Sequence, residues 1–304
     1  MFDLARLRLL RELARRGTMS AVAEAFGQTS SAVSQQLAVL EREVNASLFE
    51  RIGRRVQLTD EGKRMAAHAE AILQIAETAR LDMATDKGSP RGEVAIACFS
   101  SFAKARLVPA IVRAKARYPD IHVVVHELEP ADAVAAVRSG RCHLAITFSY
   151  NLVPRPGTRD LVVEPLLDEP VLLAVPGTPT SRPRAVRLEQ FEEAEWIVGS
   201  RHAYDRILLD RACAVAGFAP RVTHEVDDYE LILRLVAAGL GVSFVPQLAV
   251  QTPGADSVEC KIPTGMTLRR QVQAITRPAL VDSPPVRALL AELAANSETA
   301  PAQH

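Results

Sequence analysis

Hydroxyl and amide side chains gather at the start of one predicted helix near residue 30. They are Thr29, Ser30, Ser31, Ser34 and Gln35. Side chains of this kind can bond base edges and phosphates when the first turns of a helix enter the major groove of DNA. We expect Ser31, Ser34 and Gln35 to face bases, since glutamine can pair with adenine through two hydrogen bonds. Ser30 would face a phosphate, and Thr29 has the alternative role of capping the helix.

Three arginines follow this helix, where Arg51, Arg54 and Arg55 flank Gly53. Guanidinium groups at the tip of a hairpin suit contacts to phosphates or to the minor groove. The alternative is a run of solvated charges. Because the polar helix precedes these arginines so closely, we favour contact with DNA.

Residues 1–60 have the pattern of three short helices separated by tight turns. Apolar residues recur at helical spacing over 4–14, and Gly17 ends this helix. An alanine-rich helix over 19–26 and a third helix over 30–44 follow. Helix, tight turn and helix make a helix-turn-helix pattern, and the short apolar segments around Gly53 predict the two strands of a wing.

The next segment has a heptad pattern that predicts one long helix beginning near Asp60. Its apolar residues, spaced alternately by four and three, are Met65, Ala69, Ile72, Ala76, Ala79 and Met83. Such a seam is typical of a helix that packs on a partner helix, so we expect dimerisation here. The alternative is a helix that lies on its own domain, but we expect no neighbouring segment to cover the seam.

Beyond a linker at 87–92, short apolar runs alternate with helical patterns. This alternation predicts an α/β architecture with largely parallel sheets. Polar residues follow several of the runs, at the strand ends where open α/β sheets bind ligands. The candidate ligand-binding residues are Ser100, Ser101, Phe102, Thr147, Phe148, Ser200 and Arg201.

Hydroxyl groups beside free helix N–H groups favour a carboxylate, and Arg201 would strengthen this preference. We therefore expect an anionic ligand. Three alternatives stand beside this interpretation: helix capping for Ser100 and Ser101, a satisfied strand end for Thr147, and a surface charge for Arg201.

The composition is that of an ordinary globular protein, with 304 residues, 48% of them hydrophobic and 24% charged. The length suggests about two domains. Net charge is zero, yet residues 1–64 carry 11 basic and 8 acidic side chains, which leaves 25 and 28 for the rest. A basic head fits a DNA-binding domain. No apolar run is long enough to span a membrane and no signal peptide is evident, so we expect a cytoplasmic protein without a membrane partner.

Motifs for enzymatic chemistry are absent. The sequence contains no nucleophile elbow, P-loop or H-E-x-x-H zinc motif. His122 and His126 alternate on one predicted strand, but without a third ligand they are weak evidence for a metal. We expect no catalytic residue, no metal and no cofactor. The four cysteines form no C-x-x-C pair and are expected to be inert: Cys98, Cys142, Cys213 and Cys260.

Five segments of the N-terminal part occur in an order and spacing that resemble the signature of LysR-type transcriptional regulators. They are GTMSAVAEAF at 17–26, TSSAVSQQL at 29–37, LERE at 40–43, LFER at 48–51 and LTDEG at 58–62. Later segments are similar to landmarks of that family's effector domain, above all VAAGLGVSFVP at 236–246. Two residues depart from the family pattern, since many members have proline at Ser31 and arginine at Gln35.

The resemblance implies an all-α winged helix-turn-helix domain at 1–59 and a dimerising linker helix at 60–88. An α/β effector domain similar to periplasmic binding proteins would follow at 89–299. One lobe of it would comprise about 91–161 and 268–295, the other about 162–267, and the candidate ligand loops would surround the cleft between them.

The resemblance further implies a homotetramer whose partners are double-stranded promoter DNA and a small-molecule effector. RNA polymerase is a further candidate partner. We expect a sequence-specific transcriptional regulator that an effector, expected to be anionic, controls. Three alternatives remain: a thiol-based redox sensor of the same fold, a free-standing solute-binding protein and an enzyme.

Overall fold

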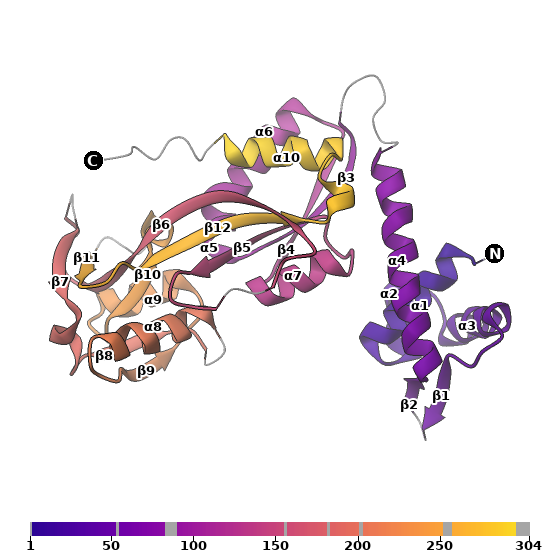
Figure 1. Ribbon diagram of the computed structural model, residues 1–304, viewed down its shortest axis with the longest axis horizontal. Helices are drawn as coiled ribbons and strands as arrows, with labels where there is room; N and C mark the ends of the chain where they lie inside the picture. Colours follow the sequence, from indigo (N-terminus) through magenta and orange to yellow (C-terminus); the bar gives the residue numbers. More distant parts are fainter. Residues whose placement is uncertain are drawn as a thin grey trace. The chain divides into compact units, whose positions relative to one another are not determined.

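The computed structural model describes residues 2–52, 55–82, 90–154, 157–180, 183–200, 203–251 and 257–295. The chain divides into two compact units, one up to residue 84 and one from residue 85. Figure 1 labels their helices and strands. In the part of the chain that the structure describes, no helix combines the length and the apolar character needed to cross a bilayer.

Three helices form the core of the first unit: α1 (Leu4–Arg16), α2 (Met19–Phe26) and α3 (Ser30–Val44). Local signals set their ends. Gly17 has the positive φ of 72° that a left-handed helix cap requires, and the next helix begins where the Thr18 hydroxyl accepts a hydrogen bond from the Ala21 N–H. The helix-turn-helix pattern therefore forms as the sequence predicts.

A short hairpin follows α3. Its strands, β1 (Phe49–Ile52) and β2 (Arg55–Leu58), pair antiparallel, so that Phe49 lies opposite Leu58. This hairpin is the wing that the sequence analysis expects beside a helix-turn-helix.

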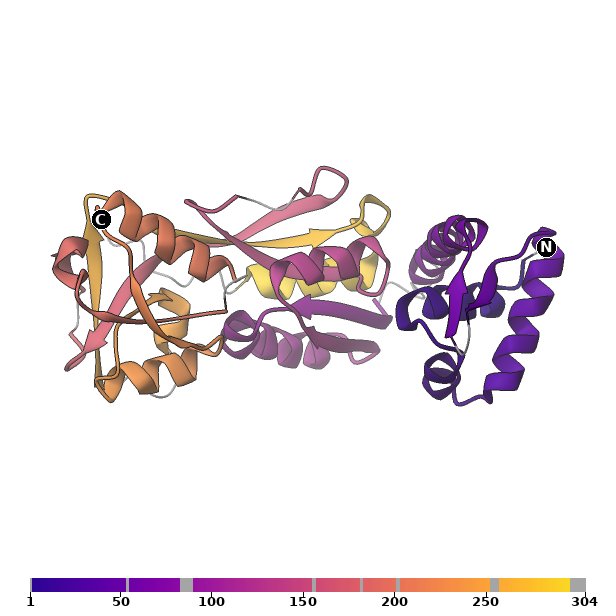
Figure 2. The ribbon, with the colours of Figure 1, turned by 90° about the horizontal axis from the view of Figure 1, so that it is seen from below.

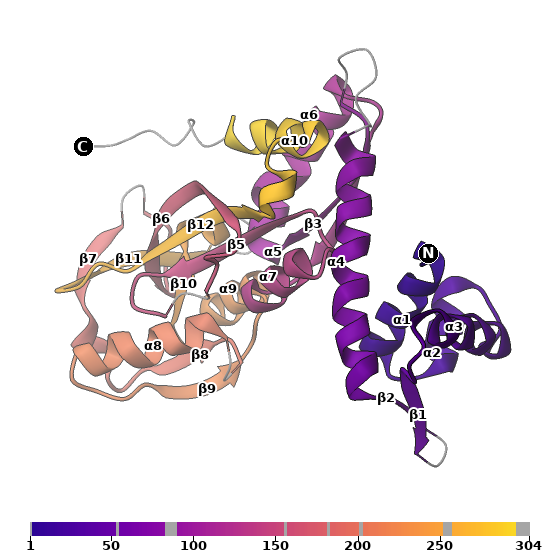
Figure 3. The ribbon, with the colours of Figure 1, turned by 45° about the vertical axis from the view of Figure 1, so that its right-hand side comes forward.

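The long helix α4 (Asp60–Asp82) packs on α1 within the first unit, as Figure 3 shows. Ala69 is fully buried and Leu73 is 6% exposed in this contact. The expectation that no neighbouring segment covers the seam is therefore wrong, because α1 covers its N-terminal half. Farther along the helix Ile75, which is not one of the predicted seam residues, is 70% exposed.

An eight-stranded mixed sheet organises the described part of the second unit. Its strands, in chain order, are β3 (Gly92–Cys98), β4 (Ile121–Glu127), β5 (Leu144–Tyr150), β6 (Val162–Pro176), β7 (Arg184–Arg187), β10 (Ser243–Pro246), β11 (Val258–Thr264) and β12 (Arg269–Thr276). The order across the sheet is β4-β3-β5-β12-β6-β11-β7, and β10 pairs with β6.

The helices of the second unit cover this sheet and a smaller one. They are α5 (Ser100–Phe102), α6 (Val108–Arg117), α7 (Pro130–Arg138), α8 (Tyr204–Val215), α9 (Tyr229–Ala237) and α10 (Pro284–Ala294). Short helical turns are η1 (Ala103–Leu107), η2 (Leu188–Phe191), η3 (Gln247–Gln251) and η5 (Pro278–Leu280). The smaller sheet pairs β8 (Glu195–Val198) with β9 (Arg221–Glu225) in parallel.

The sheets are less parallel than the sequence predicts. The pairs β3–β4, β3–β5, β7–β11 and β8–β9 are parallel, but β12 and β6 pair antiparallel with each other and with their other neighbours. The reason is that β6 and β12 run between two lobes, as Figures 1 and 2 show, and join them without a crossover helix. Apolar periodicity identifies strands but does not give their direction.

Candidate functional site

Four of the predicted DNA-contacting residues line one groove of the first unit. Ser30, Ser31, Ser34 and Gln35 lie on the first turns of α3, and the groove is completed by Met19, Phe49 and Val56 from α2 and the wing. The helix N-terminus adds a partial positive charge, which favours phosphate oxygens. Hydroxyl and amide groups on a helix thus lie next to a wing, as a groove-reading surface requires.

Thr29 caps α3 and also contacts the neighbouring serine. Its Oγ1 accepts a hydrogen bond from the Ala32 N–H at 3.2 Å and lies 3.0 Å from Ser31 Oγ. Capping therefore occupies this hydroxyl, and Ser31 is oriented by it. Of the wing arginines, Arg54 lies outside the described residues, and for Arg51 and Arg55 the structure describes only the backbone strands.

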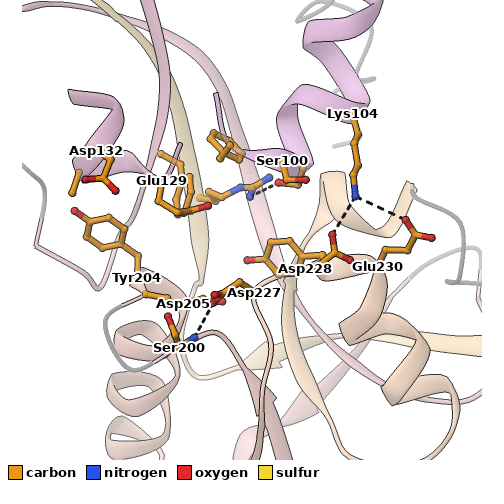
Figure 4. Close-up of a pocket in the computed structure, with 17 residues that line it drawn as sticks. Ser100, Lys104, Glu129, Asp132, Ser200, Tyr204, Asp205, Asp227, Asp228 and Glu230 are labelled. Carbon is orange, nitrogen blue, oxygen red and sulfur yellow. Dashed lines mark hydrogen bonds and ion pairs between the residues drawn. The ribbon is translucent and has the colours of Figure 1, made fainter. Parts of the chain in front are cut away.

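The second unit contains a cavity of about 380 Å³ between its lobes (Figure 4). One lobe contributes the start of α5, the turn η1, the start of α7 and the end of β5. The other contributes the loops that precede α8 and α9, and β12 supplies Arg270. The cavity is lined by Phe99, Ser100, Ser101, Lys104, Glu129, Ala131, Asp132, Phe148, Ser200, Ala203, Tyr204, Asp205, Asp227, Asp228, Tyr229, Glu230 and Arg270.

Four candidate ligand residues, Ser100, Ser101, Phe148 and Ser200, line this cavity. Phe102 and Thr147 are buried outside its lining, with exposures of 3% and 0%. Arg201 lies outside the described residues.

Sequence reasoning missed the acidic lining of the cavity. Glu129 directly precedes α7, while Asp227 and Asp228 directly follow the strand β9 and its extension at Val226. These positions are strand and helix ends of the same kind as Ser100 and Ser200. A search for every polar residue at such ends, rather than for hydroxyls, would have found them.

Two carboxylates meet above Gly199. A Cβ at this glycine would lie 2.6 Å from Asp205 Oδ1 and 2.9 Å from Asp227 Oδ1, so no larger residue fits without moving them. Backbone N–H groups hold both in place: Gly199 donates to Asp205 Oδ2 at 3.3 Å, and Ser200 donates to Asp227 Oδ1 at 2.8 Å. The loop after β8 therefore fixes a pair of acidic groups at the cavity wall.

Burial and mutual repulsion disturb the titration of this acidic group. Burial, together with the charges of Asp205 and Asp227, raises the pKa of Glu129 to about 7. Burial and the nearby Asp227 raise the pKa of Asp205 to about 6, against the hydrogen bonds from Arg206 and Gly199. Perturbed acids in a cavity are typical of a binding site.

Arg270 forms the base of the cavity and already has a partner. Its side chain is fully buried, and its Nε donates to Glu169 Oε1 at 2.7 Å. Nη1 donates to Ser101 Oγ at 3.1 Å, and the guanidinium lies over the rings of Phe99 and Phe148 at 5.1 and 5.4 Å. Burial opposes the charge, but Glu169 offsets it and the pKa of Arg270 is raised.

Two polar contacts join the lobes across the cavity. Lys104, on the π-helical turn η1, lies 3.2 Å from Asp228 and 3.9 Å from Glu230 (Figure 4). The hydroxyls of Tyr150 and Tyr229 lie 3.1 Å apart. The cavity is therefore bounded by contacts that a movement of the lobes would break.

The electrostatics of the cavity do not favour the anionic ligand expected from the sequence. Among the described residues, six carboxylates line it, against the two cationic side chains Lys104 and Arg270. That expectation depended on hydroxyls, helix ends and Arg201, and it left the carboxylates out of account.

The cysteines lack the features of a thiol sensor. Cys98, Cys142 and Cys213 are buried and Cys260 is partly buried. Burial raises the pKa of all four thiols, for Cys213 to about 12. A reactive cysteine needs the opposite shift, so this state of the protein offers no activated thiol.

Family models match both units. The model described as a bacterial regulatory helix-turn-helix protein of the lysR family covers residues 4–63, and the LysR substrate binding domain covers residues 87–298. The transcriptional dual regulator GltC of Bacillus subtilis is 30% identical over 248 residues, which are 81% of each chain.

Solved structures share the fold over nearly the whole chain. Full-length OxyR of Pseudomonas aeruginosa superposes with a TM-score of 0.69 at 23% identity, over 98% of this chain and 95% of that one. Full-length CbnR in complex with its target DNA superposes with a TM-score of 0.60 at 22% identity, over 97% of this chain and 100% of that one.

Proposed function

Because this chain belongs to the LysR family of transcriptional regulators, we propose that it reads promoter DNA through the groove at the start of α3. Ser31, Ser34 and Gln35 contact bases there, and Ser30 contacts a phosphate. The observation that carries this proposal is that these four side chains line one groove beside the wing. Arg51, Arg54 and Arg55 would extend the contact along the DNA backbone.

The cavity between the lobes of the second unit is the effector site in this proposal. Its volume of about 380 Å³ is suited to a small metabolite. Lining residues come from both lobes, so a bound effector changes the balance between open and closed arrangements. The protein acts by binding and not by catalysis, in the cytoplasm.

A second copy of the chain completes the regulator. The exposed Ile75 lies on the half of α4 that extends beyond the buried seam, and we propose that this half pairs with its counterpart in a dimer. Two such dimers form a homotetramer, which presents its heads to successive turns of the DNA and can contact RNA polymerase.

A nuclease footprint on the DNA upstream of the protein's own gene tests the proposal. We expect protection over more than one helical turn, and we expect Gln35→Ala to weaken specific binding at least tenfold, as the loss of a base contact does. Gln36→Ala is the matched control, because the Gln36 amide accepts a hydrogen bond from Arg6 within the head at 3.2 Å. If the wild type binds no DNA even at low salt, the proposal is wrong.

A further inference from the structure

We infer that the effector is an organic cation, an amine carried on an apolar body. This inference rests on the proposed role of the cavity as the effector site. Three features of the lining carry it: its unpaired carboxylates, their distribution over both lobes and the aromatic side chains between them.

Among the described residues of the lining, carboxylates outnumber cationic side chains after the ion pairs between them are taken into account. Lys104 is paired with Asp228 and Glu230, and Arg270 with Glu169. Four carboxylates remain that form no ion pair with any described residue: Glu129, Asp132, Asp205 and Asp227. Where these carboxylates are ionised, an anion would have to enter against their charge, whereas a cation would neutralise part of it.

The carboxylates approach the cavity from both sides (Figure 4). Glu129 and Asp132 belong to the lobe that contains α7, and Asp205 and Asp227 belong to the lobe that contains α8. A ligand with ammonium groups can therefore contact both lobes at once. That contact would offset the repulsion between the acids and favour the closed arrangement.

A bare metal ion fits this arrangement poorly. Among the described residues, no group of three histidine, cysteine, aspartate or glutamate side chains is close enough together to hold a metal. Asp205 and Asp227 lie together at Gly199, whereas Glu129 and Asp132 belong to the opposite lobe. Separated charges of this kind suit a ligand that has length.

Aromatic rings supply the apolar part of the site. The Phe148 ring lies 4.7 Å from Phe99 and 6.1 Å from Tyr204, measured between ring centroids. All three line the cavity. Rings beside carboxylates suit the methylene or aromatic portion of an amine.

The titration of the acids adds a signature that distinguishes a cation from an anion. Because Glu129 and Asp205 have raised pKa values of about 7 and about 6, part of the acidic group is protonated near neutral pH. A cation binds the ionised form, so its binding releases protons and strengthens as the pH rises through this range. An anion would show the reverse dependence.

Titration calorimetry on the full-length protein distinguishes these cases. The probes are 1,4-diaminobutane, spermidine and 2-phenylethylamine, each compared with a carboxylate of similar size such as succinate or 3-phenylpropanoate. We expect at least one amine to bind, with proton release and with an affinity that rises between about pH 5.5 and about pH 7.5. Asp227→Asn should weaken that binding at least tenfold.

Asp210→Asn is the matched control. Asp210 lies on α8, pairs with Arg206 at 3.2 Å and does not line the cavity, so its loss should leave amine binding unchanged. Retention of the fold in both variants is checked by their thermal melting. Equal binding by wild type and Asp227→Asn would overturn the inference.

Three further outcomes would overturn it while leaving the proposed function intact. In the first, the carboxylates bind and the amines do not, and Arg201→Ala abolishes that binding. In the second, Mg²⁺ or Ca²⁺ alone binds and displaces the amines. In the third, no probe amine binds at millimolar concentration although the protein still gives the expected footprint. Failure of the footprint itself would count against the proposed function instead.

Discussion

At the scale of single residues, the absence of a side chain at Gly199 leaves room for the carboxylates of Asp205 and Asp227. A Cβ at this position would lie within 2.9 Å of oxygens of both Asp205 and Asp227. Moving these short side chains would break their hydrogen bonds to the Gly199 and Ser200 N–H groups. We expect Gly199→Ala to lower amine affinity at least tenfold in the calorimetric assay. Gly157→Ala, where a Cβ meets open space, should have no effect.

Glu129 gives a prediction about pH. Its folded-state pKa of about 7 lies above the ordinary 4.5, so the folded protein retains a proton that the unfolded chain loses. The stability that this proton contributes is complete below about pH 4.5 and is lost as the pH rises through about 7. We expect the melting temperature of Glu129→Gln to rise relative to the wild type between about pH 5 and about pH 8. A constant difference over that range would contradict the assigned shift.

At the scale of elements, two neighbouring ion pairs join the adjacent strands β6 and β12. We expect them to contribute differently to the free energy of unfolding. Glu169 and Arg270 are 4% and 0% exposed, and Glu169 Oε2 also accepts a hydrogen bond from the Leu248 N–H at 2.6 Å. Glu169→Ala leaves the arginine charge buried without its partner, which costs about 3–5 kcal/mol of unfolding free energy. Urea denaturation measures this loss.

The control for that prediction lies one residue away. Asp168 pairs with Arg269 at 2.8 Å, but these side chains are 49% and 38% exposed. Solvent screens such a pair, so Asp168→Ala should cost no more than about 1 kcal/mol. Similar losses for the two variants would show that the buried pair does not anchor the base of the cavity.

The elements also show how far sequence reasoning reaches. Helices α1 to α3 could be predicted because their ends depend on local residues, such as the Gly17 cap and the Thr18 and Thr29 hydroxyls. The antiparallel course of β6 and β12 could not, since strand direction depends on pairing between distant segments. The acidic lining was missed for a different reason: the search at strand and helix ends considered hydroxyl groups and passed over the carboxylates of Glu129 and Asp227.

On the scale of the whole molecule, a net charge of zero conceals two opposite local fields. Residues 1–64 carry an excess of basic side chains, 11 against 8, while the described lining of the cavity in the second unit contains six carboxylates and two cationic side chains. The first field suits phosphates and the second suits amines. The composition gives only the net charge of the chain. The charge of the cavity lining, from which we infer the ligand class, depends on which residues the fold brings together.

The two sites should be coupled reciprocally. If an amine changes the affinity of the protein for its DNA site by some factor, that DNA must change the affinity for the amine by the same factor. We expect a factor of about 5 to 150, the usual range of such coupling. Calorimetric amine titrations with and without the DNA site, compared with DNA titrations with and without the amine, measure both sides. A factor of one in both directions, that is, no change in either affinity, would mean that the amine occupies the cavity without affecting DNA binding.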